Sequence, residues 1–179
     1  FRDINFLLIF PKIDNVFRNI LHKKIIYTVI MKIIIPRLII SKLIEHSLIE
    51  DPNECCGYLM GSNNKVSHIF NCRNIHQSPV TRYALDPLDQ MKAEKYADDN
   101  NLDILGIYHS HTLSQAYPSP TDVSNAVESG WIDPAYILIS LVEKTRPIIR
   151  AFKITQDKKV EEMIIEHDGQ AYISPTENS

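Results

Sequence analysis

Two histidines one residue apart, His109 and His111, have the spacing of metal ligands on a β-strand. The residues before them, 103–108, are mostly apolar, and β-branched and aromatic side chains among them favour a buried strand. Because side chains alternate along a strand, His109 and His111 lie on the same face and can share one metal ion.

The segment Ser119-Pro120-Thr121-Asp122 predicts the start of a helix downstream. Ser119 suits the N-cap, Pro120 suits the first helical position, and Asp122 falls in the first turn. This turn can bring the carboxylate of Asp122 to the two histidines. Two imidazole nitrogens and one carboxylate leave one position of a tetrahedral zinc ion free for water, as catalytic zinc sites do. The pattern therefore predicts a hydrolytic zinc centre.

Taken singly, these residues have simpler explanations. A His-x-His pair is more often hydrogen-bonded than metal-bound. Asp122 gains about 0.3–1 kcal/mol from its place near a helix N-terminus, and Ser119 gains about 1 kcal/mol as a cap. Glu54, further upstream, is on its own an ordinary acid at a loop-to-strand junction. Only the combination favours a metal site.

This combination resembles the signature of the JAMM (MPN+) family of zinc metallopeptidases, in which a glutamate precedes a His-x-His pair and a spaced Ser-x-x-Asp. The similarity runs over residues 31–166, and Glu54 lies in a segment similar to the glutamate-bearing segment of the family. Thr112 departs from the pattern, because many members have proline directly after the second histidine. This departure affects how the following loop is held more than it affects the metal.

The resemblance implies a role for each residue of the signature. The expected zinc ligands are His109, His111 and Asp122. Bound zinc lowers the pKa of water from about 15.7 to near 7. Glu54 is the candidate general base, which takes a proton from that water and passes it to the leaving amine. Ser119 is placed to donate a hydrogen bond to the oxyanion of the intermediate.

Two neighbouring segments are expected to shape access to the site. The resemblance places Arg82 and Tyr83 near the metal, where they are candidates for contact with a substrate. The loop at 113–118 is a plausible lid, because it links the histidine strand to the helix that carries the carboxylate.

The substrate is expected to be a protein tail. The chain most resembles the compact, stand-alone bacterial members of the family, some of which release cysteine from a sulfur-carrier protein with a ubiquitin-like fold. An extended tail can lie along a strand edge by β-augmentation. Two alternatives remain: an isopeptidase of the deubiquitinase type or a general peptidase, and a metal-free MPN scaffold. A zinc deaminase is excluded, because its His-x-Glu and Pro-Cys-x-x-Cys motifs are absent.

The composition suits one globular enzyme domain. Of the 179 residues, 44% are hydrophobic and 23% are charged, and the net charge of −3 gives no indication of a nucleic-acid partner. The three cysteines, Cys55, Cys56 and Cys72, form neither an even framework nor a Cys-x-x-Cys pair, which favours a reducing cytoplasm. We expect no membrane partner, and a monomer or a weak homodimer.

The first thirty residues differ from the rest. The chain begins with Phe1, its first methionine is Met31, and the early apolar stretches lack the cleavage site of a signal peptide. We expect translation to start at Met31, so that residues 1–30 are an upstream extension; a genuine N-terminal arm is the alternative. The metallopeptidase domain is expected over 31–173, with a frayed tail at 174–179.

The apolar periodicity predicts the elements that position these residues. Strands are expected over 32–35, 55–61, 66–72, 83–85, 103–108, 136–142, 148–154 and 160–166. Helices are expected over 38–49, 87–100 and 121–129, with Asp86 as a cap and Gly130 as a stop. The resulting fold class is α/β (α+β): a mixed, largely antiparallel sheet flanked by helices, which the resemblance also implies.

Overall fold

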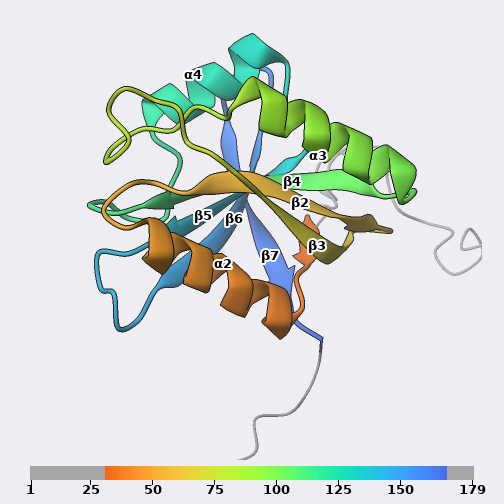
Figure 1. The fold of residues 1–179 in the computed structure, drawn as a ribbon, viewed down its shortest axis with the longest axis horizontal. Helices are drawn as coiled ribbons and strands as arrows, with labels where there is room; N and C mark the ends of the chain where they lie inside the picture. The colour runs from red at the N-terminus through yellow and green to blue at the C-terminus, as the bar shows by residue number, and fades with distance from the viewer. Residues whose placement is uncertain (1–30, 169–179) are drawn as a thin grey trace, which may run out of the picture. The chain divides into compact units, whose positions relative to one another are not determined.

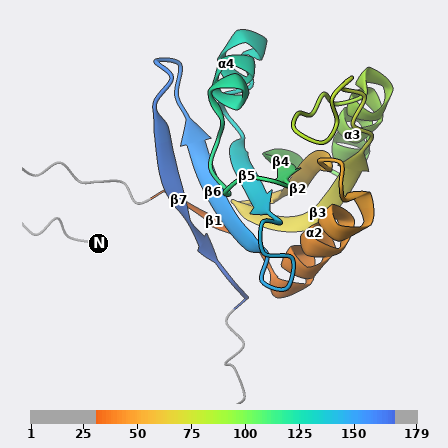
Figure 2. The ribbon, with the colours of Figure 1, turned by 90° about the vertical axis from the view of Figure 1, so that its left-hand side faces the viewer.

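A computed structural model describes residues 31–168, shown in Figures 1 and 2. Its helices are α2 (Arg37–Glu50), α3 (Pro87–Asp99) and α4 (Pro120–Ser129). Its strands are β1 (Lys32–Ile34), β2 (Cys56–Ser62), β3 (Lys65–Cys72), β4 (Asp103–His111), β5 (Ala135–Ser140), β6 (Ile148–Ile154) and β7 (Val160–Glu166). The predictions about residues 1–30 and about the tail at 174–179 lie outside the described residues, as does the predicted end of the domain at 173.

The strands form one mixed sheet in the order β1-β3-β2-β4-β5-β6-β7, and β1 also pairs with β7. The pairs β4–β5, β1–β3 and β1–β7 are parallel, and the other pairs are antiparallel. The predicted fold class, a mixed and largely antiparallel sheet, is confirmed. The closure through β1 was not predicted, because a three-residue strand is too short for its pattern to indicate its partners.

Helices cover both faces of this sheet (Figure 2). On one face, Ile39 and Leu43 of α2 belong to a core built with the strands. On the other face, Ala93 and Ala97 of α3 and Val123 of α4 belong to a second core. The small alanines let α3 lie close to the sheet. The side chains of the metal cluster described below come from this second face.

The predicted cap of α3 at Asp86 and the predicted stop of α4 at Gly130 are confirmed. The Asp86 side chain accepts hydrogen bonds from the N–H groups of Leu88 and Asp89 at the start of α3. Gly130 ends α4 with φ of 74°, a left-handed conformation that glycine adopts without a steric cost. None of the helices in residues 31–168 is both long and apolar enough to cross a membrane.

Two of the predicted strands differ from the structure. Residues 83–85 do not form a strand, and only Leu85 makes an isolated bridge, with Asn74. The Asn74 side chain accepts a hydrogen bond from the Ala84 N–H, which competes with strand pairing. The strand expected to stop at residue 108 continues as β4 through His111, because β5 pairs beside it up to Ser140. Both differences concern the surroundings of the histidines.

Gly57 in β2 makes room for the side chain of Tyr108. A Cβ atom at Gly57 would lie 2.2 Å from the carbonyl oxygen of Phe70 and 2.7 Å from the Tyr108 ring. The Tyr108 hydroxyl, next to this glycine, donates to Oδ1 of Asn71 and also pairs with Nδ1 of His46, each at 2.9 Å. This network links α2 and β3 to the residue that precedes the first histidine.

We expect Gly57→Ala to destabilise the fold by about 1–3 kcal/mol, because overpacking forces backbone or ring displacement. The free energy of unfolding, measured by denaturant titration, checks this. Gly130→Asn is the matched control: Gly130 has no atom within 4 Å of its Cβ position, and asparagine tolerates the left-handed region. A Gly57→Ala protein as stable as this control would contradict the packing argument.

Candidate metal centre

The two histidines lie at the carboxyl end of β4 and are both buried. The neighbouring parallel strand β5 holds them in place, because His109 pairs with Leu138 and His111 pairs with Ser140. Their exposed fractions are 0% and 5%. Their Nε2 atoms lie 3.1 Å apart, so the predicted sharing of one face is confirmed.

The first turn of α4 brings Asp122 to the histidines. Oδ2 of Asp122 lies 3.6 Å from the Nε2 atom of His109 and 3.6 Å from that of His111. A capping box fixes the turn: the Ser119 N–H donates to Oδ2 of Asp122 at 2.7 Å, and the Asp122 N–H donates to Oγ of Ser119 at 3.2 Å. The cap therefore orients the carboxylate.

The separations within this cluster suit a tetrahedral metal ion. Ligand atoms about 2.0–2.1 Å from a tetrahedral zinc ion lie about 3.3–3.4 Å from each other. The three separations here are 3.1, 3.6 and 3.6 Å. His109, His111 and Asp122 are also the cluster of potential metal ligands found in the described part of the chain. The donor set, two imidazoles and one carboxylate, is one that zinc accepts.

The charges within the cluster favour an ionised Asp122. Burial opposes the carboxylate, but the two histidine rings, each 3.6 Å from it, and a hydrogen bond from the Ser119 N–H hold the pKa of Asp122 well below its usual range. Burial lowers the pKa of His109, so its ring is neutral at pH 7. Burial acts in the same direction on His111, but the Asp122 carboxylate and the Gln115 carbonyl raise the pKa of His111 overall.

Glu54 lies near His111, just before the start of β2. In the antiparallel pairing of β2 with β4, Cys56 is opposite His109. Cys55 then meets Ser110, whose N–H donates to the Cys55 carbonyl at 3.0 Å and whose Oγ accepts the Cys55 N–H at 2.8 Å. Glu54 precedes this pair, outside β2; its N–H donates to the Pro79 carbonyl at 2.7 Å, and the charges of His111 and Asp122 act on its carboxyl group. The pairing of β2 with β4 thus brings Glu54 near His111, although the two residues are 57 positions apart in the sequence.

The environment of Glu54 favours its protonated form more than water would. The residue is 6% exposed. Burial raises the pKa of Glu54 to about 7, and the Asp122 charge adds to this, whereas His111 and Arg82 act against it. A carboxyl group with a pKa near neutrality can both accept and donate a proton at pH 7.

Tyr83 lies against the first histidine, and Arg82 reaches the first turn of α4, which carries Asp122. The Tyr83 ring stacks on the His109 ring with centroids 4.2 Å apart and planes 23° apart. The Nδ1 atom of His109 has no hydrogen-bond partner among residues 31–168, so the stacked Tyr83 ring helps to orient the histidine in place of a hydrogen bond at that nitrogen. Nη1 of Arg82, an exposed residue, donates to Oγ1 of Thr121 at 2.7 Å. Both residues were predicted near the metal, but the stacking of Tyr83 on His109 was not predicted.

Asn74 is a residue whose role the sequence did not indicate. Its Nδ2 donates to the carbonyls of Glu54 and Arg82, both at 2.9 Å. Its Oδ1 accepts the N–H groups of His76 and Ala84. Asn74 therefore fastens the loop that carries Tyr83 to the segment that carries Glu54. A single asparagine after a strand gives no pattern from which this could be predicted.

The loop at 113–118 is fastened to the sheet at several points. The Gln115 carbonyl lies 2.7 Å from Nδ1 of His111, and the Ser114 carbonyl accepts a hydrogen bond from Oγ of Ser140 at 2.7 Å. The Ala116 side chain is 2% exposed. The contact from Gln115 directs Nε2 of His111 toward the cluster, which is how a hydrogen bond to the far nitrogen positions a metal-binding histidine.

The three cysteines stand apart from this chemistry. Burial raises the pKa of the Cys55 and Cys56 thiols, and raises that of Cys72 to about 12. The thiol rather than the thiolate therefore predominates at pH 7, and a thiol is a poor nucleophile. All three are reduced in the structure and buried.

Comparison with known proteins found a family whose model matches most of the described residues. The family of prokaryotic homologs of the JAB domain matches residues 36–155, which is more than half of the chain. The CysO-cysteine peptidase of Mycobacterium tuberculosis is 36% identical over 118 residues, which cover 64% of this chain and 77% of that protein. The desampylase of Pyrococcus furiosus is 30% identical over 112 residues, covering 63% of this chain and 74% of its own.

Another relative and two solved structures also match parts of the chain. A probable TtuB-protein conjugate cleaving protease of Thermus thermophilus is 40% identical over 77 residues, which cover 43% of this chain and 51% of that one. Among solved structures, a Desulfitobacterium hafniense protein matches with a TM-score of 0.64 and 31% identity, over 76% of this chain and 94% of that chain. A Salinibacter ruber protein, 23% identical with a TM-score of 0.57 over 79% and 95% of the two chains, shares the fold.

Proposed function

Because this chain belongs to the family of prokaryotic homologs of the JAB domain, we propose that it is a zinc metallopeptidase acting on a ubiquitin-like sulfur-carrier protein. The reaction would be hydrolysis of the peptide or isopeptide bond that follows the carrier's C-terminal tail, for example to release cysteine. The observation that carries the proposal is the cluster of His109, His111 and Asp122, with the buried Glu54 near it. The relatives named CysO-cysteine peptidase, probable TtuB-protein conjugate cleaving protease and desampylase support the choice of substrate.

The cluster would hold one zinc ion through the Nε2 atoms of the histidines and the Asp122 carboxylate. A zinc ion there supplies Lewis acidity, which lowers the pKa of water to near 7 and stabilises negative charge on a carbonyl oxygen. The Gln115 carbonyl and the Ser119 cap keep the ligands His111 and Asp122 in place. The protein thus provides a rigid, buried site that needs no rearrangement of its ligands.

Glu54 would move the proton during hydrolysis. Its carboxylate would take a proton from the attacking water and hold it until the leaving amine accepts it. Burial raises the pKa of the Glu54 carboxyl group, which strengthens the carboxylate as a base for this step. The Ser119 hydroxyl would donate a hydrogen bond to the developing oxyanion, because its oxygen accepts the Asp122 N–H and its own hydrogen is free to turn.

Cleavage of a defined conjugate tests this function. The zinc-loaded full chain should remove one cysteine residue from a ubiquitin-like sulfur carrier extended by cysteine, seen by mass spectrometry of the intact carrier. A parallel reaction with an isopeptide conjugate of the same carrier separates the alternative, an isopeptidase of the deubiquitinase type. Failure to cleave either substrate would overturn the proposal, and so would equal cleavage of unrelated peptides.

Tyr83 offers a test of how His109 is held. We expect Tyr83→Leu to weaken zinc binding about 10–100-fold, because partners that orient a metal ligand have effects of that size. Tyr83→Phe keeps the stacked ring and should bind zinc as the wild type does. Competition with a chromogenic chelator measures both affinities. Equal affinity for zinc in Tyr83→Leu and the wild type would contradict the orienting role.

A further inference from the structure

Arg82 spans the gap between two segments that flank the metal cluster. Its side chain starts in the loop 73–86, between β3 and α3, and its Nη1 atom donates to Oγ1 of Thr121 at 2.7 Å. Thr121 directly precedes the proposed ligand Asp122 in the first turn of α4. Figure 2 shows β4 between this loop and α4. The guanidinium group therefore lies next to the candidate site.

The backbone of Arg82 is fastened to the segment that carries Glu54. The carbonyls of Arg82 and Glu54 both accept hydrogen bonds from Nδ2 of Asn74, each at 2.9 Å. Asn74 thus holds the base of the arginine side chain, and Thr121 holds its tip. The charge of Arg82 also acts on Glu54, in the direction that lowers the pKa of its carboxyl group.

The charge of Arg82 has no carboxylate partner among residues 31–168. Its guanidinium makes one hydrogen bond, to a neutral hydroxyl, so most of its N–H donors stay open. By contrast, the guanidinium of Arg73 pairs with Asp89 at 2.7 Å. That of Arg150 pairs with Glu162, also at 2.7 Å. A guanidinium with open donors is suited to bind a planar carboxylate through two parallel hydrogen bonds.

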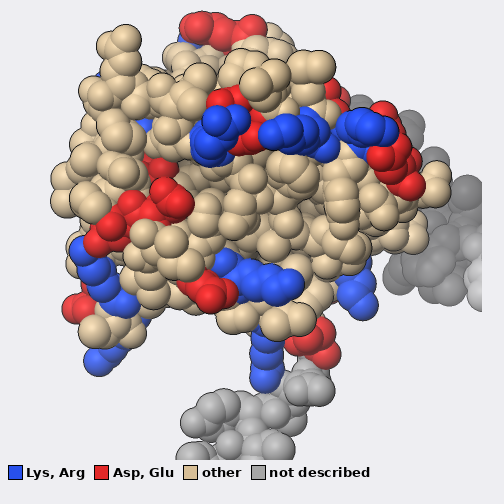
Figure 3. Space-filling view, viewed as in Figure 1, with Lys and Arg blue, Asp and Glu red and all other residues tan. Residues whose placement is uncertain are grey.

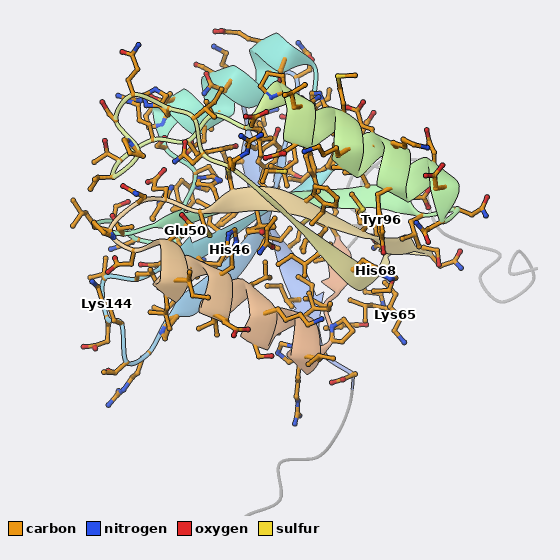
Figure 4. All side chains as sticks on the ribbon, viewed as in Figure 1. His46, Glu50, Lys65, His68, Tyr96 and Lys144 are labelled. Carbon is orange, nitrogen blue, oxygen red and sulfur yellow. The ribbon has the colours of Figure 1, made fainter. Side chains whose placement is uncertain are left out.

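Several other cations lie away from the candidate site. In Figure 3 the lysine and arginine side chains on this face mainly follow α3 and α2. Lys144 lies beside α2 in Figure 4, and it pairs with Asp51. Lys65 projects from the start of β3, at the far end of that strand from the loop 73–86. Arg82, in contrast, borders the candidate site.

A substrate that ends at the leaving residue would bring a negative charge to this site. Its terminal carboxylate is attached to the same carbon as the scissile nitrogen. That carboxylate would approach the carboxyl groups of Glu54 and Asp122, and like charges repel each other unless a cation offsets them. The leaving lysine of an isopeptide bond brings no such carboxylate. A cation at this position therefore favours a substrate with a free terminal carboxylate.

We propose that Arg82 binds the terminal carboxylate of the residue that leaves, and thereby selects a C-terminal residue over an isopeptide-linked protein. This inference rests on the proposed function and names the class of bond that is cleaved. Arg82 would donate two hydrogen bonds to the carboxylate, while Thr121 keeps the guanidinium turned toward α4. Arg82 is thus a specificity residue, since it does not act on the reacting atoms.

Paired substrates with and without the carboxylate test this role. A ubiquitin-like sulfur carrier is extended by cysteine, as the free acid or as the C-terminal amide, and is cleaved by the zinc-loaded full chain. The wild type should show a kcat/KM about 10–100-fold higher for the acid, the effect of hydrogen bonds between charged groups. Arg82→Gln should bring the ratio of the two values close to one. Equal cleavage of acid and amide by the wild type would overturn the role of Arg82.

Two further variants make this result specific to the guanidinium of Arg82. Arg82→Lys keeps the charge but not the planar fork, so it should retain only part of the preference for the acid. Arg146, on the turn between β5 and β6, is also exposed and makes no ion pair in the described part of the chain. Arg146→Gln should therefore keep the wild-type ratio. Loss of the preference in Arg146→Gln, with the preference intact in Arg82→Gln, would contradict the proposal.

Binding without turnover gives a second readout. The Glu54→Gln full chain is titrated in a calorimeter with a synthetic eight-residue peptide that ends in Gly-Gly-Cys, as the acid or as the amide. The acid should bind about tenfold more tightly. Adding Arg82→Gln to this protein should remove the difference. Equal affinity of Glu54→Gln for the two peptides would count against a carboxylate site at Arg82.

The outcomes separate the role of Arg82 from the proposed function. Cleavage of the acid and the amide at equal rates would overturn the role of Arg82 and leave the proposed function standing. Tighter binding of the acid that disappears with Arg82→Gln, without cleavage of any conjugate, would overturn the proposed function alone. A preference for the acid in cleavage and in binding, abolished by Arg82→Gln, supports both.

Discussion

Replacement of Glu54 by glutamine should lower kcat for conjugate cleavage by about 10²–10⁴-fold. Glutamine keeps the size of the side chain but cannot accept a proton, so the loss would measure proton transfer. Its neutral amide also fits a site where burial already raises the pKa of the carboxyl group to about 7. We therefore expect Glu54→Gln to fold normally, with steady-state cleavage of a carrier–cysteine conjugate as the measurement.

Two controls make this result specific to Glu54. Zinc content should be the same in Glu54→Gln and in the wild type, because Glu54 is not one of the proposed ligands. Glu45→Gln, on an exposed position of α2, should cleave at the wild-type rate. An active Glu54→Gln enzyme would show that another group moves the proton.

Replacement of Asp122 by alanine should weaken zinc binding by at least a hundredfold, since even partners of metal ligands have effects of about 10–100-fold. Cleavage should fall with the loss of zinc. Asp122 is also half of the capping box of α4, so its loss should lower the free energy of unfolding by about 1 kcal/mol. Chelator competition and denaturant titration measure the two effects separately.

Asp89→Ala is the matched control for Asp122→Ala. Asp89 and Asp122 are each 8% exposed, and each lies in the first turn of a helix. Asp89 pairs with Arg73 and Lys92, and neither belongs to the metal cluster. Asp89→Ala should therefore destabilise the fold and leave the affinity for zinc unchanged. A similar loss of zinc in both variants would mean that Asp122 acts through the stability of the fold alone.

The parts of the site that follow from local patterns were predictable. The alternation of a strand put His109 and His111 on one face, and the capping signal at Ser119 put Asp122 in a first turn. Asp86 and Gly130 marked helix ends for the same reason. Such signals act within a few residues, so the sequence carries them directly.

The contacts that depend on distant pairing were not predictable from the residues alone. The approach of Glu54 to the histidines depends on the register of β2 against β4, for which the sequence has no local marker. The stacking of Tyr83 on His109 depends on how Asn74 fastens its loop. The strand expected at 83–85 was wrong for the same reason, because the Asn74 side chain replaces a strand neighbour there.

The site lies where a central strand of the sheet and a helix packed on it bring their side chains together. The ligands His109 and His111 come from a central strand between β2 and β5, and Asp122 comes from a helix packed on that same sheet. Strand pairing fixes the two histidines relative to Glu54, and the cap of α4 fixes Asp122. A strand and a helix thus hold the three side chains of the metal cluster, which is the preorganisation that a hydrolytic metal site requires.

The most direct test of the zinc centre is X-ray absorption at the zinc edge of the zinc-loaded full chain. The account predicts one zinc ion per chain, with nitrogen and oxygen ligands at about 2.0–2.1 Å, two of them imidazoles. The His109→Ala protein should lose this signal. Failure to retain zinc, or a sulfur ligand at about 2.3 Å from one of the cysteines, would contradict the His109, His111 and Asp122 site.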